Sequence, residues 1–302
     1  MLLGLAAVPV ALLVVAALVL GLSYRGRLSA DWGAAVILHP LRRPLTGRPD
    51  MPFEDLAFRS GQDRLEGWIF RTTVERRGLV VFLHGIGHNR QAGIGVAERL
   101  VPRGYDVLAF DGRAHGRSSG EACTYGVLER HDVRRALDAI DAPRAILLGH
   151  SLGAAIALQA AAVDRRVEGV VAASPFSDLA TIVRERARWF LMPERYVEAA
   201  VKRAGELGHF APAEASPLSL APRITVPVLL LHGEDDIKTV PDHSRRIYQA
   251  LGGPRYLEIL PGVGHDEILE HEETWQRIEE FLEALATRPR AAGRTRNPAP
   301  AA

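Results

Sequence analysis

The chain has 302 residues, of which 47% are hydrophobic and 24% are charged, and its formal net charge is +1 at pH 7. This length suits one α/β domain with an insertion, and the balanced charge, without basic or acidic blocks, excludes a nucleic-acid partner. The single cysteine, Cys123, excludes an intramolecular disulfide and a thiolate metal cluster. We predict no cofactor and no metal, because the sequence has no zinc, P-loop or dinucleotide-binding signature.

Residues 2–22 contain no charged residue and are rich in leucine, valine and alanine. As a helix they would measure about 32 Å, which is enough to cross the apolar part of a bilayer. A cleaved signal peptide is the alternative, but it would need a positively charged start and a shorter apolar run. Arginines follow the run, beginning with Arg25 and Arg27. We therefore predict a single transmembrane anchor over residues 1–23, with the domain that follows on the cytoplasmic side.

Residues 24–52 come next and include Pro40, Pro44 and Pro49, so we predict a juxtamembrane linker that lies across the membrane surface. Two strand-like runs then flank a turn at residues 61–63, which predicts a hairpin. The first two strands are therefore expected to be antiparallel.

From Leu79 onward, short apolar runs alternate with helical segments, which predicts a mainly parallel, eight-stranded sheet with helices on both faces. The strands expected after the hairpin are 79–83, 105–110, 145–149, 168–173, 226–231 and 255–260. These elements define an α/β domain over residues 53–286. Residues 287–302 combine prolines with arginines and are predicted to be a disordered tail.

The connection between the strands 168–173 and 226–231 is about fifty residues long, which is unusual in a compact domain unless it carries structure or function. Its apolar pattern indicates two helices, which we expect to form a small lid over about residues 177–222. Between them lies Trp189-Phe190-Leu191-Met192. Three interpretations are open: these side chains line a pocket for an apolar (acyl) ligand, contact lipid, or pack the lid onto the domain. Packing is the favoured interpretation.

The most informative motif is Gly149-His150-Ser151-Leu152-Gly153, which lies between an apolar strand-like run and an alanine-rich helical segment. A serine flanked by glycines at a strand-to-helix turn is typical of a nucleophile elbow. The turn is so sharp that the positions two before and two after the serine tolerate almost no side chain. We therefore predict that Ser151 is a catalytic nucleophile.

A serine hydroxyl is a poor nucleophile until a base takes its proton, and that base is usually a histidine oriented by a carboxylate. In enzymes with a nucleophile elbow, the acid and then the histidine follow the serine in the chain. Here the acidic turn Glu234-Asp235-Asp236 follows one predicted strand, and His265 follows the next. The carboxyl ends of parallel strands meet at one edge of a sheet, so these residues are expected to gather beside Ser151.

These motifs resemble those of the α/β-hydrolase superfamily over roughly residues 53–285. Residues 232–236 are similar to its H-G-x-x-D turn, which implies that Asp236 is the catalytic acid and leaves Asp235 as the alternative. Residues 60–68 are similar to the opening of small membrane-anchored and prolyl-oligopeptidase-like members. The fold that this resemblance implies is the α/β-hydrolase fold.

The resemblance also implies an oxyanion hole. In the superfamily one backbone N–H comes from the residue after an early His-Gly pair, here His84-Gly85, and the other comes from the residue after the nucleophile. The corresponding residues are Ile86 and Leu152. Residues 111–118 resemble a loop that braces the site in the superfamily.

The histidines near these motifs are given separate expectations. His84 and His232 are implied to be structural, while His88 lies where it could face the substrate. The histidines without a strand-end context are expected at the surface: His39, His131, His209, His243 and His271.

Together the motifs and the resemblance imply a serine hydrolase that uses Ser151, His265 and Asp236. The leading hypothesis is a membrane-anchored esterase whose substrate is a small-molecule or lipid acyl ester, as for a carboxylesterase or lysophospholipase. Two alternatives stay open: an amidase or peptidase of the same fold, and a non-catalytic, hydrolase-like scaffold at the membrane.

Overall fold

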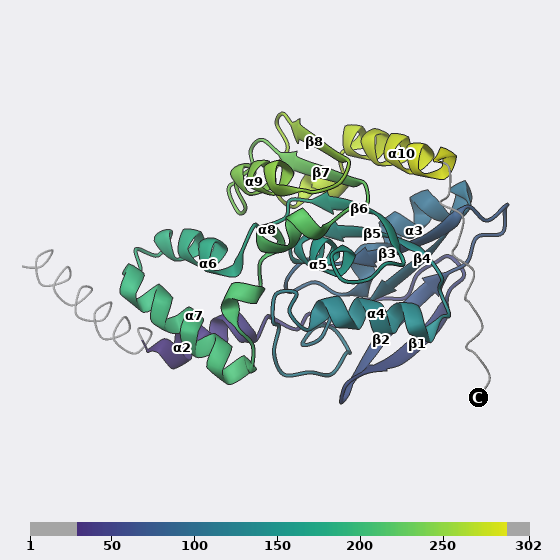
Figure 1. The fold of residues 1–302 in the computed structure, drawn as a ribbon. Helices are drawn as coiled ribbons and strands as arrows, with labels where there is room; N and C mark the ends of the chain where they lie inside the picture. Colours follow the sequence, from purple (N-terminus) through teal and green to yellow (C-terminus); the bar gives the residue numbers. More distant parts are fainter. Residues whose placement is uncertain (1–28, 289–302) are drawn as a thin grey trace, which may run out of the picture.

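The computed structural model describes residues 29–288, which form an eight-stranded sheet with helices on both faces and a helical lobe at one side (Figure 1). The strand order is β1-β2-β4-β3-β5-β6-β7-β8. The strands are β1 (Glu54–Ser60), β2 (Asp63–Phe70), β3 (Gly78–Leu83), β4 (Tyr105–Phe110), β5 (Ala145–His150), β6 (Val167–Ala173), β7 (Val228–Gly233) and β8 (Arg255–Leu260).

The first hairpin is antiparallel, as β1 pairs with β2 in the register Ser60 to Asp63, and β2 also runs antiparallel to β4. All the other strand pairs are parallel. The predicted mainly parallel, eight-stranded sheet is therefore confirmed. Parallel strands place their carboxyl ends at one edge, and the loops that leave this edge carry the candidate site.

Alternate side chains of the central strands pack into two apolar layers, one on each face of the sheet, because successive side chains of a strand point to opposite faces. In β3, Val81 and Leu83 face the layer under α4 and α5, whereas Val80 and Phe82 face the layer under α3 and α10. The helices that cover the sheet are α3 (Ile94–Leu100), α4 (Glu129–Ala139), α5 (Leu152–Ala161), α9 (Asp242–Ala250) and α10 (Glu272–Thr287). Short 3-10 turns are η1 (Arg90–Gly93), η2 (Val101–Arg103), η3 (Pro212–Glu214), η4 (Ala221–Arg223) and η5 (Glu267–Leu269).

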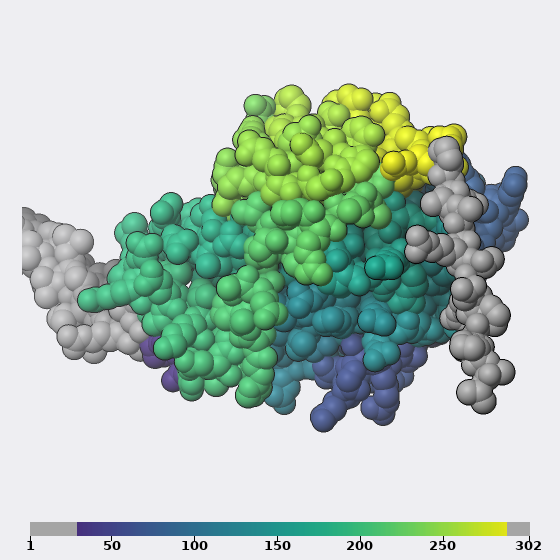
Figure 2. All heavy atoms as spheres, in the orientation of Figure 1, coloured from purple at the N-terminus to yellow at the C-terminus, as the bar shows by residue number. Residues whose placement is uncertain are grey.

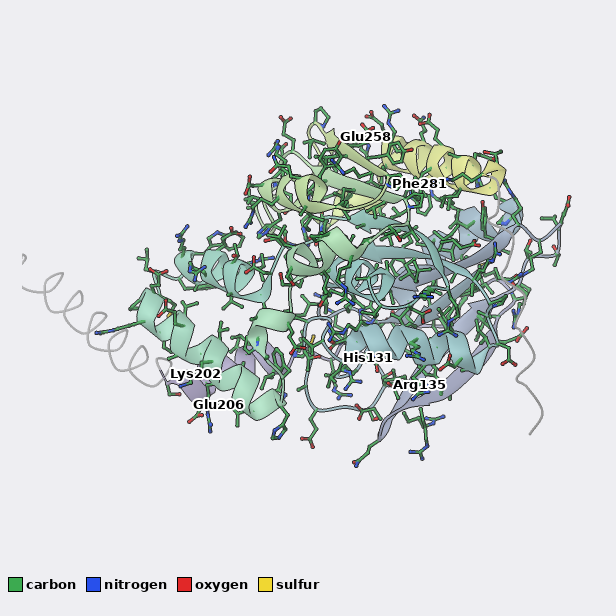
Figure 3. The ribbon with its side chains drawn as sticks, viewed as in Figure 1. His131, Arg135, Lys202, Glu206, Glu258 and Phe281 are labelled. Carbon is green, nitrogen blue, oxygen red and sulfur yellow. The ribbon has the colours of Figure 1, made fainter. Side chains whose placement is uncertain are left out.

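The connection between β6 and β7 is helical. It contains α6 (Leu179–Arg188), α7 (Glu194–Gly208) and the single turn α8 (Pro217–Leu220). Figure 2 shows α6 and α7 as a lobe that projects from the side of the molecule. Lys202 and Glu206 lie on the outward side of α7 (Figure 3), with Nζ and Oε1 4.0 Å apart.

Part of the predicted linker is a helix, α2 (Ala30–Leu38), that packs along α7. Ser29 caps it by accepting a hydrogen bond from the Trp32 N–H (3.1 Å). Its buried face includes Gly33 and Leu38, and Leu38 is 1% exposed. The expectation of a linker is therefore wrong for residues 30–38, since this short apolar face finds a partner in the lobe.

Two of the predicted segments fall beyond the described part of the chain. The predicted transmembrane anchor lies wholly outside it, and the predicted tail lies outside from residue 289 onward. Within residues 29–288, no helix has both the length and the apolar character needed to cross a membrane.

Candidate active site

Ser151 lies at the turn between β5 and α5, with a φ of 54° and a ψ of −114°. This backbone conformation is rarely adopted by residues other than glycine, and the Ser151 N–H holds it by donating to Ala173 O (2.8 Å). A Cβ on Gly153 would lie 1.9 Å from Leu83 O, and one on Gly149 would lie 2.3 Å from the Gly153 carbonyl carbon. Both glycines of the motif are thus needed for the chain to turn.

The structure brings Ser151, His265 and Asp236 together from the ends of β5, β8 and β7. His265 Nε2 is 3.0 Å from Ser151 Oγ, and His265 Nδ1 is 2.6 Å from Asp236 Oδ2. Of the three adjacent acidic residues, only Asp236 is buried, while Glu234 and Asp235 are exposed. The sequence left the acid open between Asp235 and Asp236, and the structure places Asp236 next to the histidine.

The Asp236 carboxylate is charged at neutral pH. Burial alone would raise its pKa, but hydrogen bonds from His232 and His265 and from the Thr239 N–H outweigh burial, and the pKa lies well below its usual range. A carboxylate acceptor at Nδ1 assigns the imidazole proton to that nitrogen. Nε2 is then the acceptor for the Ser151 hydroxyl, which is the tautomer that a general base requires.

Two backbone N–H groups near Ser151 are candidates for stabilising an oxyanion. Leu152 opens α5, and Ile86 lies in the turn after β3. Within residues 29–288, neither N–H donates a hydrogen bond to another group. The turn is close to the elbow, since a Cβ on Gly85 would lie 3.2 Å from His150 Nδ1 and 3.5 Å from Ser151 Cβ. These donors are thus available beside the hydroxyl.

The model of a protein family described as the alpha/beta hydrolase family matches residues 80–281, which is most of the chain. The chain belongs to this family. An uncharacterised protein of Mycobacterium tuberculosis is 29% identical over 232 residues, covering 74% of this chain and 76% of that protein. A quorum-quenching protein of Acinetobacter baumannii is 31% identical over 146 residues, covering 45% of this chain and 48% of that protein.

Among solved structures, an esterase of Pyrococcus furiosus superposes with a TM-score of 0.68 at 25% identity. The match covers 82% of this chain and 98% of the esterase. Almost the whole fold of that esterase is therefore matched by this chain.

In this α/β hydrolase the turn that contains Ile86 is fixed by the loop that follows β4. The His84 ring donates from Nδ1 to Gly85 O (2.8 Å) and accepts the Gly112 N–H at Nε2 (3.0 Å). Burial, with a smaller contribution from nearby His115, lowers the pKa of His84 to about 3, so the ring stays neutral. The structural role expected for His84 therefore follows from its two hydrogen bonds.

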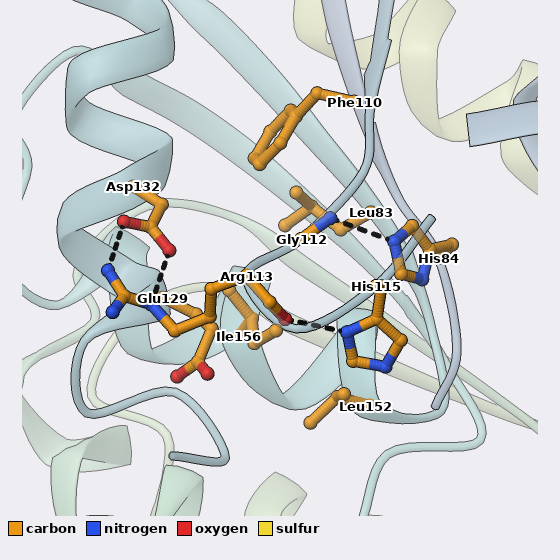
Figure 4. A pocket seen from close by; sticks show the side chains of 10 residues that line it. All are labelled: Leu83, His84, Phe110, Gly112, Arg113, His115, Glu129, Asp132, Leu152 and Ile156. Carbon is orange, nitrogen blue, oxygen red and sulfur yellow. Dashed lines mark hydrogen bonds and ion pairs between the residues drawn. The ribbon is translucent and has the colours of Figure 1, made fainter. Parts of the chain in front are cut away.

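The same loop is anchored from below by Arg113, whose guanidinium forms two hydrogen bonds with Asp132 on α4, of 2.8 and 2.6 Å (Figure 4). Arg113, His115 and Asp132 line a cavity of only about 20 Å³ beneath the elbow. A space of this size takes about one water molecule, so it is no substrate pocket. The bonds between Arg113 and Asp132 instead hold the loop whose Gly112 N–H donates to His84.

Two histidines have contacts that the sequence analysis missed. His150 is bonded from Nε2 to His265 O (2.9 Å) and so supports the loop that carries the base. His243 was expected at the surface, but it is fully buried. Its ring joins α9 to the lid, with Nδ1 2.9 Å from Ser177 Oγ and Nε2 2.8 Å from Glu185 Oε2. The spacing of His243 and Ile247, four residues apart on one helix face, was the signal for its burial.

We favoured the interpretation that residues 189–192 pack the lid onto the domain, and this is wrong for three of the four residues. Trp189, Phe190 and Leu191 are 52%, 67% and 86% exposed. Only Met192 packs against the apolar core. The turn between α6 and α7 therefore presents large apolar side chains to the surroundings of the protein.

Proposed function

We propose that this α/β hydrolase is a serine esterase, held at a membrane by residues 1–23, that cleaves a small-molecule or lipid acyl ester. The observation that carries the proposal is the continuous relay from Ser151 Oγ through His265 to Asp236, with bonds of 3.0 and 2.6 Å. The match to the Pyrococcus furiosus esterase supports ester cleavage. The charge-free run of residues 2–22 supports the anchor, and the arginines after it favour a cytoplasmic domain.

The geometry supports a two-step acyl transfer. Ser151 Oγ attacks the acyl carbon while His265 Nε2 takes its proton, and Asp236 stabilises the imidazolium that forms. The N–H groups of Ile86 and Leu152 stabilise the negative charge on the former carbonyl oxygen. His265 then protonates the departing alcohol, which leaves an ester between the acyl group and Ser151. In the second step His265 takes a proton from water, the hydroxyl attacks the acyl carbon, and the acid is released as Ser151 regains its proton.

Labelling with a fluorophosphonate tests whether the relay is active. The full chain in detergent should form a covalent adduct at Ser151, and Ser151→Ala should form none while keeping the same melting temperature. Absence of an adduct on the folded native chain would favour the non-catalytic scaffold.

Turnover of matched substrates tests the bond that is cleaved. We expect acyl esters to be hydrolysed faster than aminoacyl amides, and a comparison of short and long acyl chains would identify the preferred length. Faster amide turnover would instead assign the chain as an amidase or peptidase.

A further inference from the structure

Three consecutive large apolar residues, Trp189-Phe190-Leu191, are exposed at the turn between α6 and α7, and the reaction does not use them. We call this turn the lid tip. Leu191 is 86% exposed and has a φ of 51°, a conformation that a branched side chain rarely adopts. Solvent-exposed aromatic and leucine side chains in sequence are uncommon unless they contact a partner. The lid tip is therefore a candidate contact surface.

The chain enters the described structure beside this turn. A Cβ on Gly33 would lie 2.7 Å from Tyr196 Oη near the start of α7, and one on Gly208 at the end of α7 would lie 2.8 Å from Leu38 Cδ2. The helices α2 and α7 therefore run in the same direction, and both begin at the lid tip. The described structure therefore begins, at Ser29, on the side of the protein where the lid tip lies, and the charge-free run of residues 2–22 ends seven positions before Ser29 in the sequence.

The charges around the lid tip are mainly positive. Arg188 and Arg195 flank it, and both are exposed without a carboxylate within 4 Å in residues 29–288. Of the nearby acids, Glu185 is bound to His243, and Glu194 is paired with Arg184 (3.1 Å). Unpaired arginines beside tryptophan, phenylalanine and leucine are the combination that binds at the surface of an anionic bilayer.

The lid tip is also coupled to the site through α6. The Arg186 guanidinium lies 5.1 Å from the centre of the Trp189 ring. Burial lowers the pKa of Arg186, and the carboxylates of Asp236 and Asp266 act against that shift. Arg186 is therefore within electrostatic reach of the acid that orients His265. A surface that binds Trp189 would therefore also lie near Arg186 and the charges of the site.

We propose that the lid tip inserts into the surface of an anionic lipid bilayer, so that the active site opens toward the membrane and takes its acyl substrate from it. This inference rests on the proposed membrane anchor and extends it: the protein has a second membrane contact, located on the lid. Tryptophan and arginine suit the headgroup level, whereas Phe190 and Leu191 are suited to the acyl-chain boundary.

A polarity-sensitive dye on the lid tip tests the insertion. Cys123 is fully buried and is the only cysteine, so Leu191→Cys adds the one reactive thiol. The control is Val74→Cys, because Val74 is 54% exposed in the connection that precedes β3, at the sheet edge opposite the site. The full chain is reconstituted in vesicles of phosphatidylcholine and phosphatidylglycerol, with or without bromine-labelled acyl chains.

We expect the dye at position 191 to shift its emission to the blue and to lose most of its intensity with bromine-labelled lipid, whereas the dye at position 74 should do neither. Flotation of the vesicles reports the anchor in the same sample. Floating protein with an unquenched, water-like dye at 191 would overturn the inference and leave the anchor intact. Protein that does not float would overturn both. A blue shift without lipid quenching would indicate contact with a second copy and would also overturn it.

A double variant tests the consequence for turnover. Phe190→Ser with Leu191→Ser should lower turnover of a long-chain ester embedded in vesicles several-fold and leave turnover of a short soluble ester unchanged. Equal effects on both substrates would contradict membrane insertion of the lid tip. Fluorophosphonate labelling of Ser151 is measured in parallel, and its failure would count against the esterase function independently of the dye.

Discussion

His232 and Asp236 are in direct contact: His232 Nε2 lies 3.3 Å from Asp236 Oδ2, the same oxygen that accepts the bond from His265. His232 Nε2 also donates to Thr239 O (2.6 Å), and the Thr239 N–H donates to the other Asp236 oxygen (2.7 Å). The contacts within the turn after β7 therefore orient the Asp236 carboxylate independently of His265. This arrangement explains why the third acidic residue of the turn, and neither of the first two, reaches the histidine.

Replacing each aspartate in turn should show whether Asp236 or Asp235 is the catalytic acid. Asp236→Asn removes the charge that fixes the His265 tautomer, so kcat for an acyl ester should fall by about 10⁴-fold, the magnitude known for the serine-protease triad. Asp235→Asn, at an exposed position, should change kcat by less than about twofold. Steady-state kinetics of the two variants makes the comparison. If Asp235→Asn caused the large loss, the acid would have to be reassigned.

The elbow glycines should be sensitive to a single methyl group. Gly153→Ala would place a Cβ 1.9 Å from Leu83 O, a backbone atom that cannot move aside, so we expect a loss of at least about 3 kcal/mol in the free energy of unfolding. Gly95→Ala is the matched control, because nothing lies within 4 Å of its Cβ and the residue is in α3. Better helix propensity should stabilise that variant by about 0.5–1 kcal/mol. Equal denaturant midpoints for the two variants would refute the packing argument.

The sequence predicted the sheet because its strands are short apolar runs in regular alternation with helices, and the observed strands agree to within two residues, as β7 shows with Val228–Gly233 against the expected 226–231. It also identified the three residues that the structure brings together, since elbow and strand-end turns are local motifs. Contacts between segments that are distant in the sequence could not be predicted from it. Nothing local in the sequence shows that α2 packs on α7, or that His243 faces the lid, because each depends on a partner more than fifty residues away.

Acid should destabilise the protein through its buried neutral histidines. The pKa of His84 is lowered to about 3, chiefly by burial, against about 6.5 in an unfolded chain. Between these values the unfolded state binds one proton more than the native state, so stability is fully present above pH 6.5 and decreases as the pH falls. His84 alone contributes about 1.4 kcal/mol per pH unit.

The measurement is the free energy of unfolding of the full chain in detergent, by urea titration at several pH values between about 6 and 4.5. Carboxyl groups that take up protons in this window do so in the native chain and in the variant alike, so the difference between the two slopes reports His84. His84→Gln should reduce the slope with pH by about 1.4 kcal/mol per unit, whatever its effect on absolute stability. An unchanged slope would show that His84 is protonated in the native state.

The buried bond between His243 and Glu185 should hold the lid in place. His243 Nδ1 accepts the Ser177 N–H (3.1 Å), so the proton lies on Nε2 and is donated to Glu185 Oε2 at 2.8 Å. Glu185→Ala leaves that buried N–H without an acceptor, which costs about 1–3 kcal/mol. Because Glu185 is on α6, the loss should loosen the lid, and trypsin should cleave at its arginines sooner than in the native chain.

Glu185→Gln keeps an acceptor and should restore most of the resistance. Glu198→Ala, an exposed change on α7, is the control and should leave the cleavage rate unchanged. Equal cleavage rates for Glu185→Ala and Glu198→Ala would mean that the lid is held by its apolar contacts alone.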